Sequence, residues 1–305
     1  MEYVALKDVC KINMGQSPDS SSYNDKKEGI PFYQGNADFG EKHPIPRVWC
    51  NAPTKIAQPK DILMSVRAPI GALNYAQEKC CIGRGLAAIT PDKDKLSLEF
   101  LYWFLRGKNS ELNSKGTGST FKAISKKTLE EIRVPLIDLE KQQKMAQALE
   151  KTYSVIQMRT KQSKELDDLI KARFVEMFGD PETNSKGWAE ISLSEKLNVL
   201  GGYAFKSDQF EETGGIPVLR IGNINSGYFK PVNMVYWKED RSLERYAMYP
   251  GDLVMSLTGT VGKDDYGNVC ILGNAYEMYY LNQRNAKLEL KDGLDKYYLA
   301  ELLKF

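Results

Sequence analysis

The sequence predicts an α/β protein in which two duplicated globular domains are joined by one long helix. Within residues 138–180, no glycine or proline occurs before Gly179, which is typical of a single long helix. The segments on either side of it repeat the same short motifs in the same order. Each repeat alternates apolar, strand-like runs with turn residues and contains one amphipathic helix. We therefore expect domains at 1–137 and 181–305, with a spacer helix at 138–180.

The two domains share a framework of glycine turns and apolar strands. In the first domain the framework comprises Gly29-Ile30-Pro31, Gly35-Asn36, Asp61 to Ser65, Gly71 and Arg84. In the second domain it comprises Gly215-Ile216-Pro217, Gly222-Asn223, Asp252 to Ser256, Gly262 and Arg284. The order is the same while the spacers differ in length, which indicates one duplicated domain with divergent loops. Two domain-sized copies exclude a solenoid of many short repeats.

Apolar runs and turn residues assign most elements of the first domain. They predict strands at 30–33, 60–65 and 133–136, and a strand pair within 79–90 that holds Arg84 between two glycines. Amphipathic spacing predicts a helix at 96–106, and a helix at 297–305 ends the second domain. Polar loops occupy 15–23 and 114–124. Loops of this kind are where recognition residues concentrate.

The long helix carries an apolar stripe. Apolar or small residues recur at alternating spacings of three and four, the pattern of a coiled-coil seam. At a rise of about 1.5 Å per residue, roughly 40 residues give a rod of about 60 Å. We expect the stripe to pair with another helix through Leu149, Tyr153, Ile156, Leu166, Ile170 and Phe174. The alternative is a helix packed inside one globular domain, which would be unusually long.

The composition is that of an ordinary globular protein. Of 305 residues, 42% are hydrophobic and 27% are charged, enough for two domain cores and a spacer. No apolar run approaches the roughly 20 residues that span a bilayer, and the N-terminus lacks the apolar core of a signal peptide. Five cysteines, an odd number, fit reduced thiols rather than a disulfide framework. We therefore expect a cytoplasmic protein.

The net charge of +2 carries little information by itself. Lys and Arg outnumber Asp and Glu in residues 1–137, and the reverse holds in residues 181–305. If both domains contact phosphate groups, the first domain attracts them more strongly, because its net charge is positive. The second domain must then gather its cations on one face.

Motifs for catalysis or for a cofactor are missing from the sequence. His43 is the single histidine and lies in a loop between Lys42 and Pro44, so a His-based triad has no partner signature. Zinc spacings, a GxGxxG turn after a strand and the carboxylates of two-metal nucleases are missing too. The glycine loop that begins at Gly116 does not match a P-loop, and turn chemistry or a contact with a DNA phosphate explains it equally well. We expect no catalytic residue, no metal and no cofactor.

Together these features resemble the DNA specificity subunit of bacterial type I restriction-modification systems. The resemblance rests on the duplicated framework, on the segment 116–136 that leads into the long helix, and on the end of that helix at Gly179-Asp180-Pro181. It implies two target-recognition domains held apart by long helices, each binding one half of a split double-stranded DNA target. It also implies that DNA methyltransferase subunits and a restriction subunit supply all catalysis.

Side chains that can contact bases or phosphates lie on the predicted loops. Arg and Lys suit guanine or phosphate, Asn and Gln suit adenine, and Ser and Thr suit either. The candidates are Gln16, Ser17, Asn36, Arg67 and Arg84 in the first domain and Lys206, Arg220, Asn223, Asn225, Thr258, Thr260, Lys263 and Arg284 in the second. The two Gly-Asn asparagines have an equal alternative as turn residues, and Arg84 and Arg284 as members of ion pairs. Arg67 and the 258–260 loop are the best candidates, because they diverge after an identical Met-Ser.

The second domain stops where the first continues into the glycine loop and the long helix. The resemblance implies a second long helix packed antiparallel to the first, so the stripe lacks that partner here. We expect a second copy of the chain or a methyltransferase subunit to cover it, unless the natural protein is longer. Two other functions stay open. One is a half-type adaptor that dimerises through its helix and binds DNA only within a complex, and the other is a coiled-coil scaffold that links proteins.

Overall fold

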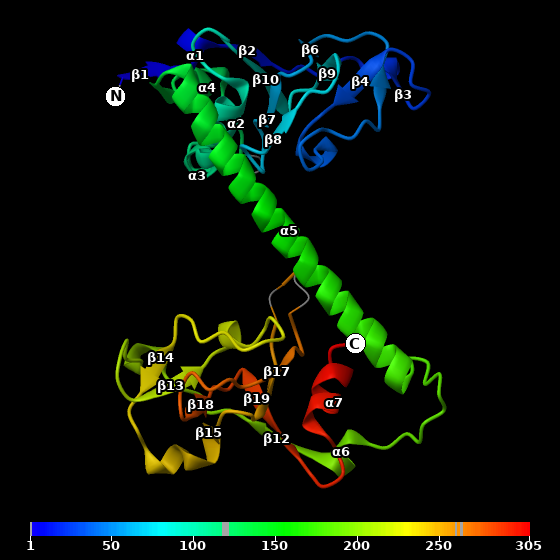
Figure 1. Ribbon diagram of the computed structural model, residues 1–305, viewed down its shortest axis with the longest axis vertical. Helices are drawn as coiled ribbons and strands as arrows, with labels where there is room; N and C mark the ends of the chain where they lie inside the picture. The colour runs from blue at the N-terminus through cyan, green and yellow to red at the C-terminus, as the bar shows by residue number, and fades with distance from the viewer. Residues whose placement is uncertain (1, 118–121, 260, 263–264) are drawn as a thin grey trace. The chain divides into compact units, whose positions relative to one another are not determined.

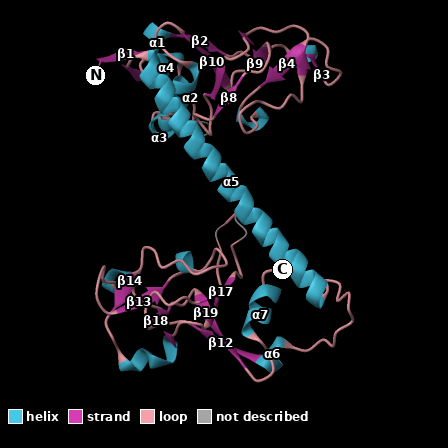
Figure 2. Ribbon diagram, in the orientation of Figure 1, coloured by secondary structure: helices cyan, strands magenta, loops and turns pink. Residues whose placement is uncertain are grey.

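The computed structural model describes residues 2–117, 122–259, 261–262 and 265–305 and divides into two compact units. Unit 1 is Met1–Lys161 and unit 2 is Gln162–Phe305 (Figure 1). The boundary lies within the long helix α5 (Leu139–Phe178), so each unit contains part of that helix. Both units combine strands with helices, which confirms the predicted α/β class (Figure 2).

The first sheet of unit 1 is antiparallel and packs against a helix. In spatial order its strands are β2 (Cys10–Met14), β10 (Leu86–Pro91), β7 (Ile62–Ser65) and β8 (Leu73–Tyr75). Ile62 and Ile89 of this sheet are fully buried in one cluster with Leu101 of α2 (Leu98–Gly107). The Ser97 hydroxyl caps α2 by accepting a hydrogen bond from the Phe100 amide. The helix predicted at 96–106 is confirmed.

The second sheet of unit 1 packs on the opposite face of the first sheet. In spatial order its strands are β3 (Tyr23–Asn24), β5 (Trp49–Cys50), β4 (Ile30–Tyr33), β9 (Cys80–Ile82) and β6 (Ile56–Ala57). The β4 and β9 strands run parallel, and the other pairs are antiparallel. Leu63 and Ala88 of the first sheet share a core cluster with Tyr33 and Ile82 of the second. Because side chains alternate along a strand, the first sheet is buried on both faces.

Short elements complete unit 1. They are α1 (Leu6–Val9), α3 (Asn109–Ser114), α4 (Lys126–Glu130), the 3-10 helices η1 (Ser20–Ser22) and η2 (Asn36–Asp38), and a ribbon of β1 (Glu2–Ala5) with β11 (Arg133–Leu136). The fully buried Val134 of β11 and Leu129 of α4 join the cluster under α2.

Unit 2 repeats both sheets, so the predicted duplication is present in the fold. Its antiparallel sheet has the order β12 (Leu197–Gly201), β19 (Asn285–Leu290), β16 (Leu253–Ser256), β17 (Val269–Ile271). Its second sheet has the order β14 (Val235–Trp237), β13 (Ile216–Leu219), β18 (Tyr279–Leu281), β15 (Ala247–Met248). As in unit 1, the two central strands of the second sheet, β13 and β18, run parallel. The shared strand order and the shared parallel pair are stronger evidence of duplication than the sequence motifs.

Short helices complete unit 2. They are α6 (Leu193–Lys196), α7 (Lys296–Leu302) and the 3-10 helices η3 (Ser207–Gln209), η4 (Ile221–Asn223) and η5 (Arg241–Tyr246). Leu299 of α7 is buried against the sheet, as Leu101 of α2 is in unit 1.

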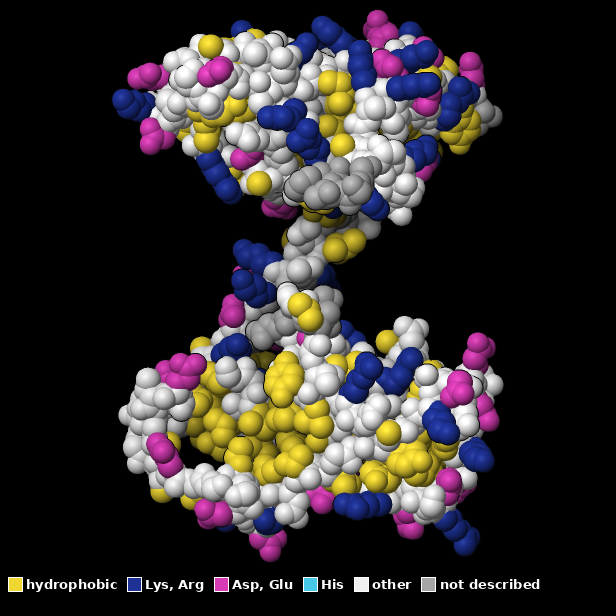
Figure 3. Space-filling view, turned by 180° about the vertical axis from the view of Figure 1, so that it is seen from behind, with side chains coloured by type: hydrophobic (Ala, Val, Ile, Leu, Met, Phe, Trp, Pro, Cys, Tyr) yellow, Lys and Arg dark blue, Asp and Glu magenta, His cyan; other side chains and the backbone are white. Residues whose placement is uncertain are grey.

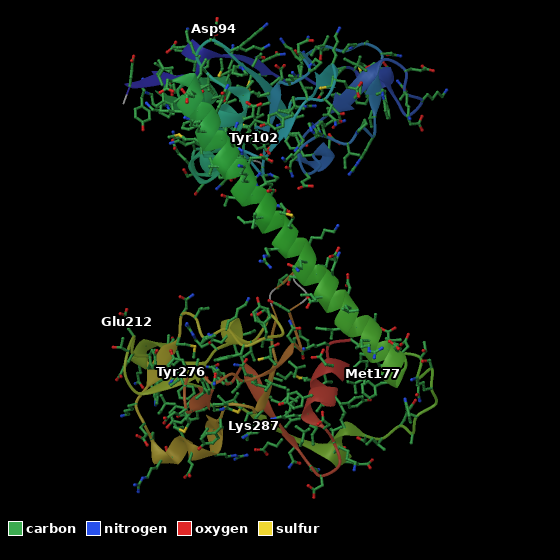
Figure 4. The ribbon with its side chains drawn as sticks, viewed as in Figure 1. Asp94, Tyr102, Met177, Glu212, Tyr276 and Lys287 are labelled. Atoms are coloured by element: carbon green, nitrogen blue, oxygen red, sulfur yellow. The ribbon has the colours of Figure 1, made fainter. Side chains whose placement is uncertain are left out.

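One face of unit 2 carries a broad patch of hydrophobic side chains (Figure 3). Lys287 of β19 forms an ion pair with Asp252 across the sheet, with 3.0 Å between Nζ and Oδ2 (Figure 4).

The strand pair expected within 79–90 is a crossover between sheets. β9 pairs with β4 and β6 in the second sheet, whereas β10 pairs with β2 and β7 in the first. Residues 83–85 connect them, and residues 282–284 make the same connection between β18 and β19 in unit 2. Two consecutive apolar runs predict two strands, but they do not reveal whether those strands pair with each other.

The N-terminal half of α5 is anchored on unit 1. Gln142 is fully buried, and its amide accepts a hydrogen bond from the Ser97 amide (2.8 Å) and donates to the carbonyls of Lys95 and Ile137. The Arg106 guanidinium lies 5.2 Å from the Trp103 ring centroid and 4.2 Å from that of Tyr153. Tyr102, labelled in Figure 4, belongs to the same helix, α2. The N-terminal part of α5 is thus fixed to α2 by hydrogen bonds of a buried side chain, by cation–π contacts and by the edge-on contact of Trp103 with Tyr153.

The C-terminal part of α5 packs in unit 2. Phe174 is 6% exposed, and its ring contacts Tyr298 and Phe305. Gly179 follows the helix with a φ of +88°, a conformation that favours glycine at a helix end.

Exposed apolar residues on α5 form a broader band than the predicted stripe, because Val155, Met158 and Leu169 are exposed as well. Leu149, Ile156, Leu166 and Ile170 are about half exposed, as expected for a pairing surface. Tyr153 and Phe174, which the prediction also assigned to pairing, are instead packed within their own units. Alternating spacings of three and then four from Leu149 place Thr152 and Arg173 on the same face as Ile156, Leu166 and Ile170.

The cysteines are buried within the two cores. All five are free thiols, and Cys80 and Cys81 are strand residues of β9, as predicted. Burial raises the pKa of Cys10, Cys80 and Cys270 to about 12.

Within the described residues no helix is long and apolar enough to cross a membrane. In the same residues no cluster of His, Cys, Asp and Glu is arranged to hold a metal ion.

Candidate functional site

Four segments of unit 1 meet at the crossover between its two sheets, and we call this place rim 1. It consists of residues 15–17, 34–35, 66–67 and 83–85. Backbone hydrogen bonds hold the segments together: Gly15 N to Leu86 O (2.8 Å), Gln16 N to Ile82 O (2.9 Å), Val66 N to Gly85 O (2.9 Å) and Gly85 N to Gln34 O (3.1 Å). Side chains of these segments therefore stand on a rigid frame rather than on independent loops.

Unit 2 builds the same frame, which we call rim 2, from residues 202–204, 220–221, 257–258 and 282–284. The corresponding bonds are Gly202 N to Asn285 O (3.1 Å), Tyr203 N to Leu281 O (2.8 Å) and Leu257 N to Arg284 O (2.8 Å). Ladder registers agree, because Leu86 faces Ser65 in unit 1 and Asn285 faces Ser256 in unit 2. Three of the four bonds of rim 1 thus have a counterpart in rim 2, which aligns three of the segments residue by residue. The segments at 34–35 and 220–221 are aligned by the parallel strands that precede them.

This superposition corrects one pair in the sequence repeat. The sequence aligns Arg84 with Arg284, because both are arginines after the last framework strand. In the hydrogen-bond register, Arg284 takes the place of Gly85. The Gly85 carbonyl accepts from the Val66 amide, and the Arg284 carbonyl accepts from the equivalent Leu257 amide. The position of Arg84 is occupied by Gln283. In contrast, Arg67 and Thr258 occupy equivalent positions, as the sequence indicated.

Glycine is required where the first segment of each rim crosses the connection between the sheets. A Cβ atom on Gly15 would lie 2.1 Å from the Gly83 carbonyl oxygen, and one on Gly202 would lie 2.2 Å from that of Asn282. No side chain fits at such distances without moving backbone. The repeated glycine thus has the same steric cause in both units.

Rim 1 brings together four of the five candidates predicted in the first domain. Gln16, Arg67 and Arg84 are exposed, and the Arg84 amide donates a hydrogen bond to the Ser17 hydroxyl (3.4 Å). Arg67 lies in a backbone bridge with Ala123, next to the glycine loop. Residues 118–121 of that loop lie outside the described residues.

Asn36 lies beside rim 1, in η2. The side-chain hydrogen bonds that hold this turn go to Asp38 and not to Asn36. The Asp38 carboxylate accepts hydrogen bonds from the Gln34 and Gly35 amides. In unit 2, the Asn223 side chain accepts the corresponding bond from the Arg220 amide (2.9 Å). Asp38 is therefore the structural counterpart of Asn223, although Asn36 is the one that matches it in sequence.

Two predicted contacts in unit 2 are occupied by bonds within the chain. Asn223 is buried, and its amide donates to the carbonyls of Lys230 and Val232, each at 3.0 Å. Asn223 was predicted to be either a base contact or a turn residue, and in the structure it is a turn residue. The half-buried Asn225 donates to the Asp265 carboxylate (3.1 Å). Neither asparagine is therefore a proposed DNA contact.

The remaining candidates in unit 2 lie on or near rim 2. Arg220 and Arg284 line a cleft of about 690 Å³, together with Asn282 and Gln283. Thr258 is exposed on the segment that follows β16, and Lys206 is exposed next to the cleft residue Phe205. Thr260 and Lys263 lie outside the described residues.

The arginines of both rims have free charge. Among the described residues, none of Arg67, Arg84, Arg220 and Arg284 forms an ion pair, so the alternative of structural ion pairs finds no support. Arg220 donates one hydrogen bond, to the Asn233 carbonyl (2.6 Å). Burial raises the pKa of the nearby Tyr23 phenol, and the charge of Arg84 acts in the opposite direction. Cations without carboxylate partners are suited to an anionic ligand such as a phosphate.

Sequence inspection missed three rim residues. Gln34, Asn282 and Gln283 stand at the ends of the two parallel strands, and Gln34 and Gln283 are exposed. The available signal was their position directly after strands that lead into turns. For Asn282 and Gln283 it was hidden because the neighbouring Arg284 matches Arg84 in the sequence repeat.

Comparison with known proteins identifies the family. The model of the type I restriction modification DNA specificity domain matches residues 1–168 and 185–305. The chain belongs to this family. The two matched segments contain the two sheet pairs and one rim each, so the family match and the duplicated fold agree.

Named relatives of this DNA specificity family member are themselves specificity subunits. A putative type I restriction enzyme MjaX specificity subunit from Methanocaldococcus jannaschii is 45% identical over 161 residues, which are 53% of this chain and 38% of the relative. The EcoBI specificity subunit from Escherichia coli is 19% identical over 295 residues, 85% of this chain and 60% of the relative. The chain thus covers less than two thirds of the length of either relative.

Solved structures show the same fold. The S subunit of a type I restriction-modification system from M. genitalium has a TM-score of 0.56 at 16% identity, covering 99% of this chain and 76% of that one. A similarity at this identity supports the architecture only. It confirms that two α/β units and a long helix form a fold known from specificity subunits.

Proposed function

We propose that this chain is a DNA-reading component of a type I restriction-modification system, in which each unit recognises one half of a bipartite double-stranded target. The proposal rests on one observation: the same rim, with free cations and amide side chains, is built twice on one framework. Exposed Arg, Gln and Thr side chains on a rigid frame can bond base edges, and free cations can contact phosphates. The family match supplies the ligand, DNA.

The long helix sets the gap between the two half-targets in this proposal. Its 40 residues correspond to about 60 Å at 1.5 Å per residue. That length equals about 18 base pairs at 3.4 Å each. The buried bonds of Gln142 support this role, since a spacer can measure distance only if it is fixed to the unit that binds DNA.

Catalysis is assigned to partner proteins. We propose DNA methyltransferase subunits and a restriction subunit as partners in the cytoplasm, and no cofactor bound by this chain. The exposed stripe of α5, with Leu149, Ile156, Leu166 and Ile170, is the proposed pairing surface for a second helix. A second copy of the chain is one such partner, and a methyltransferase subunit is another.

The test is the salt dependence of DNA binding. The full chain, alone and with its methyltransferase subunit, is titrated with labelled duplex DNA between about 50 and 200 mM salt. Contacts to several phosphates predict a linear fall of log K with log salt, about 0.9 per phosphate neutralised. A protein scaffold would show no such slope, and absence of binding under all conditions would refute the proposal. Binding only with the methyltransferase would favour the half-type adaptor.

A further inference from the structure

We infer that Arg84 and Gln283 are equivalent base-reading residues, so that the half-target of unit 1 contains a guanine where the half-target of unit 2 contains an adenine. This inference rests on the proposed function and adds to it a specificity residue, Gln283, and the bases that the two residues select.

The equivalence follows from the backbone. Arg84 is the middle residue of the three that connect β9 to β10, and Gln283 is the middle residue of the three that connect β18 to β19. The amide two residues after each of them donates to the carbonyl of the first residue of the connection: Leu86 N to Gly83 O (3.0 Å) and Asn285 N to Asn282 O (2.9 Å). This shared bond closes the same turn around Arg84 and Gln283, although the Gly85 amide donates to the Gln34 carbonyl and the Arg284 amide donates to the Asn282 side chain (3.3 Å). The two side chains therefore leave equivalent turns of the two rims.

Both side chains are available. Each is exposed, and within the described part of the chain neither the Arg84 guanidinium nor the Gln283 side-chain amide makes a hydrogen bond. Gln283 also lines the cleft of rim 2. A surface side chain with unused donors, held on a fixed backbone, is what direct contact with a base edge requires.

The chemistry separates the two bases. A guanidinium can donate two hydrogen bonds to O6 and N7 of guanine, whereas a carboxamide can accept from N6 and donate to N7 of adenine. A second pair of positions shows the opposite exchange, because Gln34 in unit 1 and Arg220 in unit 2 are each the first residue after the corresponding parallel strand, β4 or β13. Each rim therefore keeps one arginine and one glutamine on neighbouring segments, in exchanged places.

Arg284 has a different role. It occupies the position of Gly85, which carries no side chain, so its guanidinium has no counterpart in unit 1. We assign it to a phosphate contact, which holds rim 2 on DNA without selecting a base. This assignment separates the two neighbouring residues Gln283 and Arg284 experimentally.

The experiment selects binding sites from a duplex DNA library with randomised positions, using the full chain with its methyltransferase subunit. In Gln283→Arg, one position of one half-target should change from A·T to G·C. In Arg84→Gln, one position of the other half-target should change from G·C to A·T. The expected change in preference is on the order of tenfold to a hundredfold at that position, with all other positions unchanged.

Two control variants carry the same charge changes elsewhere. Lys93→Gln removes a cation at the other end of β10, and Asn198→Arg adds one on β12. Both should select the wild-type sequence. Arg284→Ala should weaken binding to every sequence about equally and lower the salt slope by about 1.

The outcomes separate the inference from the proposed function. If wild type selects no sequence, the proposed function fails. If wild type selects a bipartite target but both exchanges leave it unchanged, only the inference is overturned. Should Gln283→Arg fold poorly by its melting temperature, Gln283→Ala replaces it. This variant should relax the preference for adenine at one position, and a uniform loss of affinity on all sequences would overturn the inference.

Discussion

Steric limits at single glycines shape both rims. Gly202 lies against the Asn282 carbonyl, so the first segment of rim 2 touches the connection that carries Gln283. Its neighbour Gly201 has no atom within 4 Å of an added Cβ. Two adjacent glycines in one strand end thus have opposite tolerance for a side chain.

Gly202→Ala should therefore destabilise unit 2 by roughly 1–3 kcal/mol, because the methyl group must displace backbone. It should also weaken selection at the half-target of unit 2 by moving residues 282–284. Thermal unfolding and site selection measure the two effects. Gly201→Ala is the matched control and should leave stability unchanged or slightly higher. Equal effects of the two substitutions would contradict the steric explanation.

Polar residues in loops located the site better than the pairing of residues between the two sequence repeats did. The sequence located the loops that carry Gln16, Arg67 and Thr258, because they follow framework strands. It paired Arg84 with the wrong arginine, since identity in sequence outweighed a register that only backbone hydrogen bonds define. It also could not show that Asn223 is buried, because burial depends on residues 230 and 232, which fold back onto it.

At the scale of elements, the anchor of α5 was not visible in the sequence. Gln142 looks like a solvated residue between two polar neighbours, Lys141 and Gln143, yet it is fully buried and makes three hydrogen bonds. Two of those bonds join the start of α5 to the segment that begins α2. Together with the contacts of Tyr153, they hold the helix on unit 1.

Gln142→Ala should destabilise unit 1 by about 2–4 kcal/mol, since it leaves a cavity at a fully buried position and removes the partner of the Ser97 amide and of the Lys95 and Ile137 carbonyls. Hydrogen exchange should show lost protection at the Ser97 amide, together with lower stability in urea. The neighbouring exposed Gln143→Ala should change stability by less than about 0.5 kcal/mol. Retained protection at Ser97 in Gln142→Ala would exclude the anchor.

Most elements were correctly predicted as helix or strand. Which strands pair with each other in a sheet could not be predicted. Apolar runs located β7 and β11, and the pattern at 138–180 located α5 within two residues at either end. Pairing of β9 with β4 rather than β10 depends on contacts between distant segments. The same holds for Tyr153 and Phe174, whose rings meet α2 and α7 instead of a partner helix.

At the scale of the whole molecule, the length of α5 should control the gap between half-targets. Insertion of seven residues after Ser163 adds about 10.5 Å and keeps the heptad pattern of the stripe. We expect the selected target to keep both half-sequences and to lengthen its gap by about 3 base pairs. Site selection with the inserted variant measures the gap directly.

A variant with the same length tests whether sequence changes alone have this effect. Thr160→Ala together with Ser163→Ala alters the exposed centre of α5 without changing its length. It should select the wild-type gap. An unchanged gap in the insertion variant would show that the helix does not set the distance.

The flanks of the two reading positions differ, and this difference has a consequence for stringency. Arg84 stands between Gly83 and Gly85, whereas Gln283 stands between Asn282 and Arg284. An isolated long side chain tolerates neighbouring mismatches, while the two adjacent amide side chains of Asn282 and Gln283 reject more of them. We therefore expect the half-word read by unit 1 to carry less information than the one read by unit 2, so that near-cognate sites in a genome deviate mainly on the side of unit 1.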